Sequence, residues 1–144
     1  GFNFSKDSRN VYYDGKDLEP EIDPKTIVAL NYSYIKDKTG VFGWDYYMKE
    51  LIKTDVADVA SFRAVGTCGS AEKSFAHYYR DNSSIYIPSE SSGMEKLDSI
   101  DAGTFEYLGV YEVAEGMSYS VAYAKDKNAV YKSCGQVLAG EFAR

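Results

Sequence analysis

The feature that most constrains this chain is a ten-residue pattern that occurs four times. Each copy reads as an aromatic residue, any residue, Lys or Arg, Asp, three further residues, Val or Ile, a second aromatic residue and one further residue. A pattern repeated in one chain predicts a repeated folding unit. The four copies are FSKDSRNVYY (4–13), YIKDKTGVFG (34–43), YYRDNSSIYI (78–87) and YAKDKNAVYK (123–132).

Each copy is typical of a β-hairpin. Aromatic and β-branched residues favour extended strands on both sides of a short polar segment. The Asp at the centre has a short side chain that can accept hydrogen bonds from backbone N–H groups ahead of it and so start a turn. We therefore predict four structural turns that begin at Asp7, Asp37, Asp81 and Asp126.

A second element alternates with the hairpins, in the stretches IDPKTI (22–27), ADVASF (57–62) and IDAGTF (100–105). Asp is a favoured N-cap residue, and Pro24 would occupy the first helical position, where its missing N–H costs nothing. The pattern thus predicts short helices of one to three turns, capped by Asp23, Asp58 and Asp101.

Short extended pieces precede these predicted helices, at 15–18, 48–52, 94–97 and 135–138. The expected fold class is therefore α+β and sheet-dominated, with irregular tandem repeats of hairpin, short strand and short Asp-capped helix, mainly antiparallel. We predict one domain over residues 1–144, with units at about 1–31, 32–66, 75–109 and 119–144. The last unit reaches 139–144 at the point where its helix should begin, so either these residues close the array or the chain was cut from a longer one.

Tyrosine is unusually common, with 14 copies in 144 residues. Tyr is amphipathic and favours strands, so many rings are expected to lie partly in the core with their hydroxyls in water. Paired aromatic residues could also form a contact surface for a sugar or a protein. The candidates for this contact surface are Trp44, Tyr46, Tyr47, Tyr78 and Tyr79.

Charge and hydropathy argue against nucleic-acid binding and against a membrane-spanning helix. The net charge of -6, without a basic run, argues against nucleic-acid binding. No apolar run approaches the roughly 18 residues of a membrane helix, so no membrane span is expected. The chain begins at Gly1 without Met, which indicates a processed or shortened N-terminus.

The two cysteines, Cys68 and Cys134, are too far apart in sequence for Cys-x-x-Cys chemistry. They could form one disulfide or remain two buried thiols, depending on the redox compartment. A disulfide would close a loop of tens of residues and contribute on the order of 4 kcal/mol.

No motif predicts catalysis, a cofactor or a metal. The Asp turns lack the converging oxygens, the turn Gly and the distal Glu of a calcium loop. The Gly-rich segment 66–74 has Glu72 directly before Lys73, where a phosphate-binding loop has Gly. His77 is the single histidine and is expected on a strand surface. We predict no catalytic, cofactor-binding or metal-binding residues.

The hairpin motifs resemble the bacterial DKNYY repeat family, which is named for such a sequence. The resemblance is best at 123–131 and 6–13 and weakest at 78–87, where Arg80 replaces Lys. It implies an uncharacterised bacterial protein, often exported to the periplasm or cell surface, with no catalytic residues to carry over.

The expected function is that of a non-enzymatic binding or structural module. Its expected partner is an unknown protein or an envelope component, and its oligomeric state is open. The alternative is an immunity-type inhibitor that binds a cognate bacterial toxin, which small size, acidity and the lack of catalytic motifs would suit.

Overall fold

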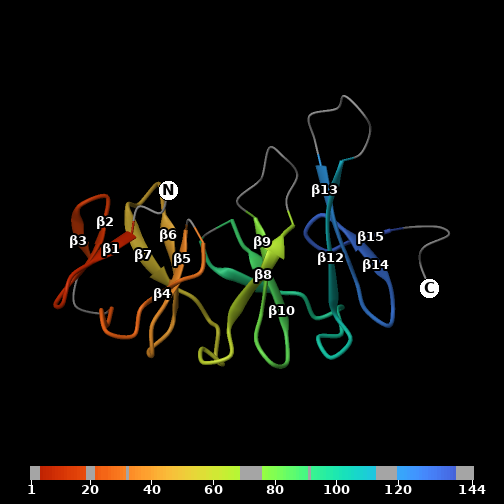
Figure 1. Ribbon diagram of the computed structural model, residues 1–144, viewed down its shortest axis with the longest axis horizontal. Coiled ribbons are helices and arrows are strands. Elements are labelled where there is room, and N and C mark those ends of the chain that lie inside the picture. The colour runs from red at the N-terminus through yellow and green to blue at the C-terminus, as the bar shows by residue number, and fades with distance from the viewer. Residues whose placement is uncertain are drawn as a thin grey trace. The chain divides into compact units, whose positions relative to one another are not determined.

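The structure, a computed structural model, describes residues 4–18, 22–31, 33–68, 76–90, 92–112 and 120–138. Within these ranges the chain forms 15 strands and no helix (Figure 1). The strands make four antiparallel sheets, which we number first to fourth in chain order. Residues 139–144, which were expected to end the fourth unit, lie outside the described residues.

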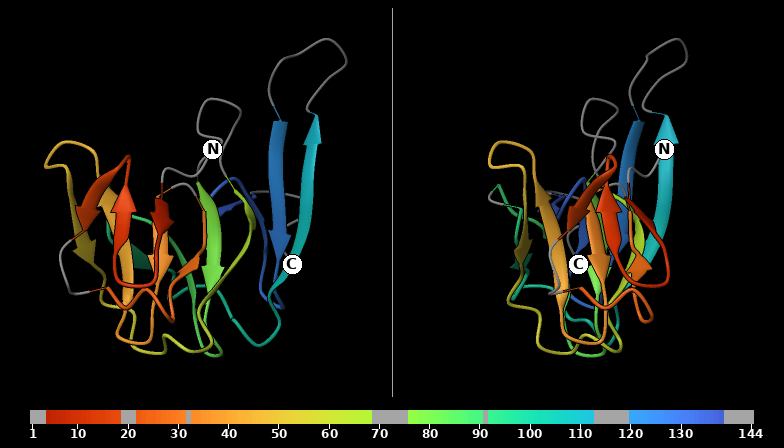
Figure 2. Two further views of the ribbon diagram at one scale, coloured as in Figure 1. Left: turned by 60° about the vertical axis from the view of Figure 1, so that its left-hand side comes forward. Right: turned by 90° about the vertical axis from the view of Figure 1, so that its left-hand side faces the viewer.

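Each sheet is a meander in which neighbours along the chain are hydrogen-bonded neighbours in the sheet (Figure 2). The first contains β1 (Phe4–Lys6), β2 (Val11–Tyr13) and β3 (Lys16–Leu18). The second contains β4 (Val28–Ala29), β5 (Tyr34–Lys36), β6 (Val41–Asp45) and β7 (Glu50–Lys53). The third contains β8 (Arg63–Thr67), β9 (His77–Arg80), β10 (Ile85–Pro88) and β11 (Met94–Lys96). The fourth contains β12 (Glu106–Glu112), β13 (Ser120–Lys125), β14 (Val130–Lys132) and β15 (Gln136–Val137).

The α+β prediction is wrong, because the three expected helices are single turns. Backbone bonds close these turns, from Ile27 N to Asp23 O, Phe62 N to Val59 O and Thr104 N to Asp101 O. The residues after these turns enter β4, β8 and β12. The first turn of a helix is unfavourable in free energy, and these segments are too short to extend a helix beyond it. Residues that join a sheet instead form hydrogen bonds with a neighbouring strand along their whole length.

The four hairpins share one register, counted from the turn Asp. The residue before Asp pairs with the fourth residue after it, and the residue two before pairs with the fifth after. The second of these pairs is Ser5↔Tyr12, Ile35↔Phe42, Tyr79↔Tyr86 and Ala124↔Tyr131 in the four sheets. The predicted hairpins are therefore repeats in structure as well as in sequence.

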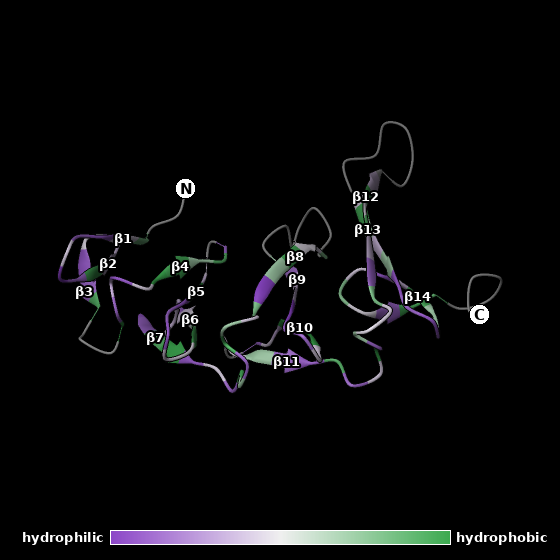
Figure 3. Ribbon diagram, turned by 60° about the horizontal axis from the view of Figure 1, so that its bottom comes forward, coloured by the Kyte–Doolittle hydropathy of each residue, from purple (hydrophilic) through white to green (hydrophobic). Residues whose placement is uncertain are grey.

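The turn that joins the last two strands of every sheet also repeats. Each contains a non-glycine residue in the left-handed region, namely Asp14 (φ 48), Lys49 (φ 54), Ser92 (φ 61) and Ser133 (φ 51). Such conformations match the right-handed twist of the strands that a tight hairpin joins. The edge strand β3 carries Lys16 and Asp17 and is drawn largely in the hydrophilic colour (Figure 3). Charged edges oppose pairing with the strands of other chains.

The chain divides into two compact units, one of residues 1–62 with 89–94 and the other of 63–88 with 95–144. In the first unit the core joins Val11 of the first sheet to Ile35 and Phe42 of the second. In the second unit it joins Tyr78 and Ile85 of the third sheet to the fourth sheet's Ala124 and Tyr131, among others.

Candidate functional site

The four hairpin aspartates make the same turn. One carboxylate oxygen, Oδ1, accepts hydrogen bonds from the backbone N–H groups two and three residues ahead, and the Asp N–H donates to the carbonyl three residues ahead. The paired N–H···Oδ1 distances are 2.7 and 2.8 Å at Asp7, 2.7 and 3.1 Å at Asp37, 2.9 and 2.8 Å at Asp81, and 2.8 and 2.9 Å at Asp126. The short Asp side chain thus fixes each reversal of the chain.

The second carboxylate oxygen, Oδ2, connects the turn to the sheet. At three turns it accepts the hydroxyl proton of the Tyr five residues ahead: Tyr12 at 2.8 Å, Tyr86 at 2.8 Å and Tyr131 at 3.0 Å. In the second sheet this position is Phe42, which has no hydroxyl. Asp37 Oδ2 accepts from the backbone N–H of Asp23 instead.

Two hairpin aspartates also bind the bend that precedes their sheet. Asp37 Oδ2 accepts from Asp23 N at 2.7 Å, and Asp126 Oδ2 accepts from Asp101 N at the same distance. The bend also accepts a hydrogen bond from the hairpin: Thr26 Oγ1 accepts from the backbone N–H of Lys38 at 3.1 Å. Thr104 and Lys127 make the equivalent contact at 3.0 Å.

Lysine side chains complete this arrangement. Lys38 Nζ lies 3.0 Å from Asp23 Oδ2, and Lys127 Nζ lies 3.7 Å from Asp101 Oδ2. The aspartates predicted as helix caps therefore hold bends instead: Asp23 accepts from Lys25 N, Asp58 from Ser61 N and Oγ, and Asp101 from Thr104 Oγ1. The sequence signal, which was missed, is Asp-x-x-Thr in the bend followed by Asp-Lys in the next hairpin.

The environment keeps the hairpin carboxylates ionised. Burial acts to raise the pKa of Asp37, Asp81 and Asp126, but hydrogen bonds to each carboxylate outweigh it and hold each pKa below 3.8. At the exposed Asp7, the backbone bond from Arg9 is the largest cause of a lowered pKa. The hairpin aspartates are thus kept charged by the hydrogen bonds of their own turns, and their role is to hold those turns.

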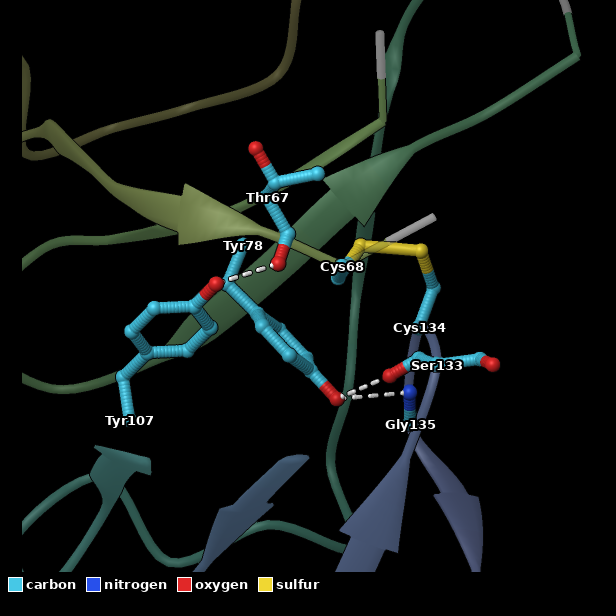
Figure 4. The surroundings of a disulfide bond; sticks show 7 residues. All are labelled: Thr67, Cys68, Tyr78, Tyr107, Ser133, Cys134 and Gly135. Carbon is cyan, nitrogen blue, oxygen red and sulfur yellow. Dashed lines mark hydrogen bonds between the residues drawn. A yellow bond between two sulfur atoms is a disulfide. The ribbon is translucent and has the colours of Figure 1, made fainter. Parts of the chain in front are cut away.

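A disulfide joins Cys68, just after β8, to Cys134 in the turn between β14 and β15 (Figure 4). Beside it, Tyr78 Oη donates to Ser133 O at 2.5 Å and accepts from Gly135 N at 2.8 Å. Burial raises the pKa of Tyr78 to about 12. The bridge and the buried phenol fasten this turn of the fourth sheet to the third sheet.

A second tyrosine strengthens the same junction. Tyr107 Oη donates to Thr67 O at 2.6 Å (Figure 4). The Tyr107 ring also covers Gly66, where a Cβ atom would lie 2.4 Å from a ring carbon. Gly66 follows a register shift in β8. The glycine is therefore required by the close approach of the ring.

Three of the five predicted contact residues are buried, which corrects that prediction. Trp44 is 5% exposed and stacks on Tyr13 with ring centroids 4.0 Å apart. Tyr78 and Tyr79 are both fully buried, so both faces of β9 are covered at these positions. The alternation of side chains on a strand predicted one exposed ring in the pair, which holds only for a strand with one face in water.

The other two predicted contact residues lie at the tip between β6 and β7. Tyr46 is 58% exposed and Tyr47 96% exposed, and Met48 beside them is 68% exposed. Asp45 Oδ1 orders this tip by accepting from Tyr47 N at 2.8 Å and Met48 N at 3.0 Å. The tip is therefore an ordered, exposed apolar group.

The fourth sheet carries a second apolar feature, a cavity of about 460 Å³. The residues that line it are partly or largely exposed: Leu108, Tyr111, Tyr123, Val130 and Leu138. The sequence offers no direct signal for this cavity, because its residues come from three strands and the segment after them.

The remaining candidates show no assembled chemistry. Among the described residues, no group of three or more His, Cys, Asp or Glu side chains is placed to hold a metal ion. His77 is half-buried in β9, and both cysteines are in the disulfide. Most of segment 66–74 lies outside the described residues. The described part of the chain contains no helix of a length and apolarity that would span a membrane.

Comparison with known proteins adds no identification: no family model, no curated protein and no solved structure matches this chain.

Proposed function

We propose that this protein is a non-enzymatic recognition module, and that the tip between β6 and β7 is its contact surface. The observation that carries the proposal is the exposure of Tyr46, Tyr47 and Met48 side by side on one ordered turn. Exposed aromatic residues and Met are enriched where proteins contact partners. A lone exposed apolar residue would need no explanation, but three adjacent ones do.

The tip is also held in place before any ligand binds. The hydroxyls of Tyr46 and Ser33 lie 3.1 Å apart, and the Tyr46 ring meets Tyr13 edge to face with centroids 6.5 Å apart. Lys49 adopts φ 54 to close the turn. Because the backbone is already fixed, binding would lose little conformational entropy.

The chemistry of the tip suits a ligand with a flat apolar face. A protruding aromatic ring can stack on the apolar face of a sugar or enter an apolar groove of a protein. We therefore propose an envelope component as the ligand. The disulfide supports this proposal, because disulfides persist in oxidising compartments such as the periplasm and the cell surface.

The test is co-sedimentation of the oxidised full chain with purified bacterial cell-wall polysaccharide. We expect binding that Tyr47→Ser weakens by about tenfold, as for a contact residue worth about 1.4 kcal/mol. Val28→Ser is the matched control, because Val28 is an exposed apolar residue on β4 and not in the tip. Equal binding by both variants would overturn the assignment of the tip.

A different outcome would identify the immunity-type alternative. A stoichiometric, salt-sensitive complex with one basic toxin, and no binding to polysaccharide, would show that the acidic chain recognises a protein. Tyr47→Ser should then be measured on that complex.

A further inference from the structure

One packing rule joins the sheets inside both units. In the first unit, the face of the first sheet that carries Phe4 and Val11 packs against Ile35 and Phe42 of the second sheet. These two sets lie at different positions relative to the turn Asp. The first set is three before and four after its Asp, and the second is two before and five after.

The second unit obeys the same rule. Tyr78 and Ile85 lie three before and four after Asp81, and they pack in one cluster with Ala124 and Tyr131. The latter residues lie two before and five after Asp126. We call the face with the residues three before and four after the turn Asp the three-before face, and the face with the residues two before and five after it the two-before face. In both units, the three-before face of one sheet packs against the two-before face of the next.

The cavity on the fourth sheet lies on the three-before face, on which no further sheet packs among the described residues. Its lining residues correspond one to one with residues of the third sheet. The first strands of the two sheets, β8 and β12, each begin directly after a Phe, namely Phe62 and Phe105, which we take as equivalent. With this alignment, the register shifts of the two strands also fall at equivalent positions, just before Gly66 and Gly109. In order, Leu108, Tyr111, Tyr123, Val130 and Leu138 correspond to Val65, Cys68, Tyr78, Ile85 and Leu97.

The two sets differ in burial. In the third sheet, Cys68, Tyr78 and Ile85 are fully buried, and Val65 and Leu97 pack against the same cluster. In the fourth sheet the Tyr111 side chain is 56% exposed and the other four are half-buried. We name these five residues the open fourth-sheet face.

The first sheet presents the complementary surface. Its two-before pair, Ser5 and Tyr12, is the only such pair with an exposed member among the four described hairpins. Tyr12 bonds Asp7 as Tyr131 bonds Asp126, and the small Ser5 stands where the fourth sheet has Ala124. We name Ser5 and Tyr12 the open first-sheet face.

We propose that the open fourth-sheet face binds the open first-sheet face of a second copy of this chain. The contact would repeat the packing that joins the third and fourth sheets, with the Tyr12–Asp7 pair in the place of Tyr131–Asp126. Because the two faces differ, the interface is head-to-tail and leaves one face of each kind free at the ends of a dimer. Association therefore continues beyond two copies or closes into a ring.

The test is sedimentation velocity of the oxidised full chain, from low concentration up to about 1 mM, where weak contacts are populated. We expect the mean mass to rise with concentration beyond that of a dimer. Val130→Asp places a charge in the open fourth-sheet face, and Ser5→Arg places a bulky charge on the open first-sheet face. Each should weaken association by about tenfold or more.

Mixing the two variants distinguishes this interface from others. Each variant keeps the face that the other lacks, so the mixture should form dimers that grow no further. Tyr111→Asp, at a more exposed position of the same face, replaces Val130→Asp if the latter fails to fold. Tyr47→Ser, at the tip, is the control and should associate like the unaltered chain.

Three results would overturn the proposal. A chain that stays monomeric up to the highest concentration has no such interface. Association that Val130→Asp abolishes and Ser5→Arg leaves unchanged would indicate a fourth-sheet to fourth-sheet dimer. Association that is unaffected by either variant would place the contact on another surface.

Discussion

Replacement of Asp37 by Asn tests whether the hairpin carboxylates hold the fold. Asp37 is 3% exposed, and its carboxylate accepts from Asp23 N at 2.7 Å, Thr39 N at 2.7 Å, Thr39 Oγ1 at 2.6 Å and Gly40 N at 3.1 Å. Asn can keep the bonds to Oδ1, but its amide NH₂ then faces the Asp23 N–H. Two donors would meet where a charged acceptor stood.

The expected cost comes from that one lost contact. A hydrogen bond to a charged group contributes about 1.5–3 kcal/mol, so Asp37→Asn should raise the unfolding equilibrium constant by about 10- to 150-fold. Urea unfolding followed by Trp44 fluorescence measures this change. Trp44 is the single tryptophan and stacks on Tyr13 in the same unit.

Asp7→Asn is the matched control in the same unit. Asp7 makes the same turn, but it is exposed, and its Oδ2 partner is the Tyr12 hydroxyl, which can rotate to accept from an amide. We expect a smaller loss of stability than for Asp37→Asn. Equal losses, or no loss at Asp37, would refute the claim that the bond to the bend stabilises the unit.

The pH dependence, the disulfide and one glycine give three further predictions. Because the four hairpin aspartates have folded-state pKa values below 3.8, their contribution is present above that pH and should be lost as pH falls through 3.8 and below; a circular dichroism titration in which stability rises on acidification would contradict this. Reduction of the Cys68–Cys134 bridge, which spans 66 residues, should lower the stability of the second unit by about 4 kcal/mol, measured by denaturation with and without reductant; unchanged unfolding would show that the bridge restrains nothing. Gly66→Ala should cost about 1–3 kcal/mol in a thermal melt, because the added methyl meets the Tyr107 ring, whereas Gly103→Ala, with no heavy atom closer than 3.8 Å, should cost less; the reverse order would contradict the packing.

The sequence allowed the hairpins to be predicted because their signal is local. The Asp, the polar residues after it and the flanking aromatic residues all act within ten positions, so Asp7 and Asp126 could be assigned the same turn without knowledge of their surroundings. The alternation of these hairpins with Asp-containing bends was also visible. The stretches 22–27, 57–62 and 100–105, which lead into β4, β8 and β12, were wrongly predicted as helices.

The error at the bends has a physical cause. An Asp with Thr three residues later satisfies the same N–H groups in an N-cap and in a single turn, so Asp23 and Asp101 carry no information about the next ten residues. The choice depends on sheet partners that are distant in sequence, such as the pairing of Glu106 with Lys125. Tertiary pairing overrode the local preference.

The exposure of the candidate contact residues was predicted only in part for a related reason. Tyr47 and Tyr79 are equally aromatic and equally strand-like in sequence, yet one is 96% exposed and the other fully buried. Burial of a strand's second face depends on what packs there, which no short window of sequence encodes. The open fourth-sheet face likewise combines residues that are far apart in sequence, from Leu108 to Leu138.

The most direct test of the repeated architecture is a nuclear Overhauser spectrum of the full chain. We predict the same cross-strand contacts in all four hairpins, with Ser5 opposite Tyr12, Ile35 opposite Phe42, Tyr79 opposite Tyr86 and Ala124 opposite Tyr131. A different register in any hairpin, or helical contacts in the residues after Asp23, Asp58 or Asp101, would contradict the proposed repeat.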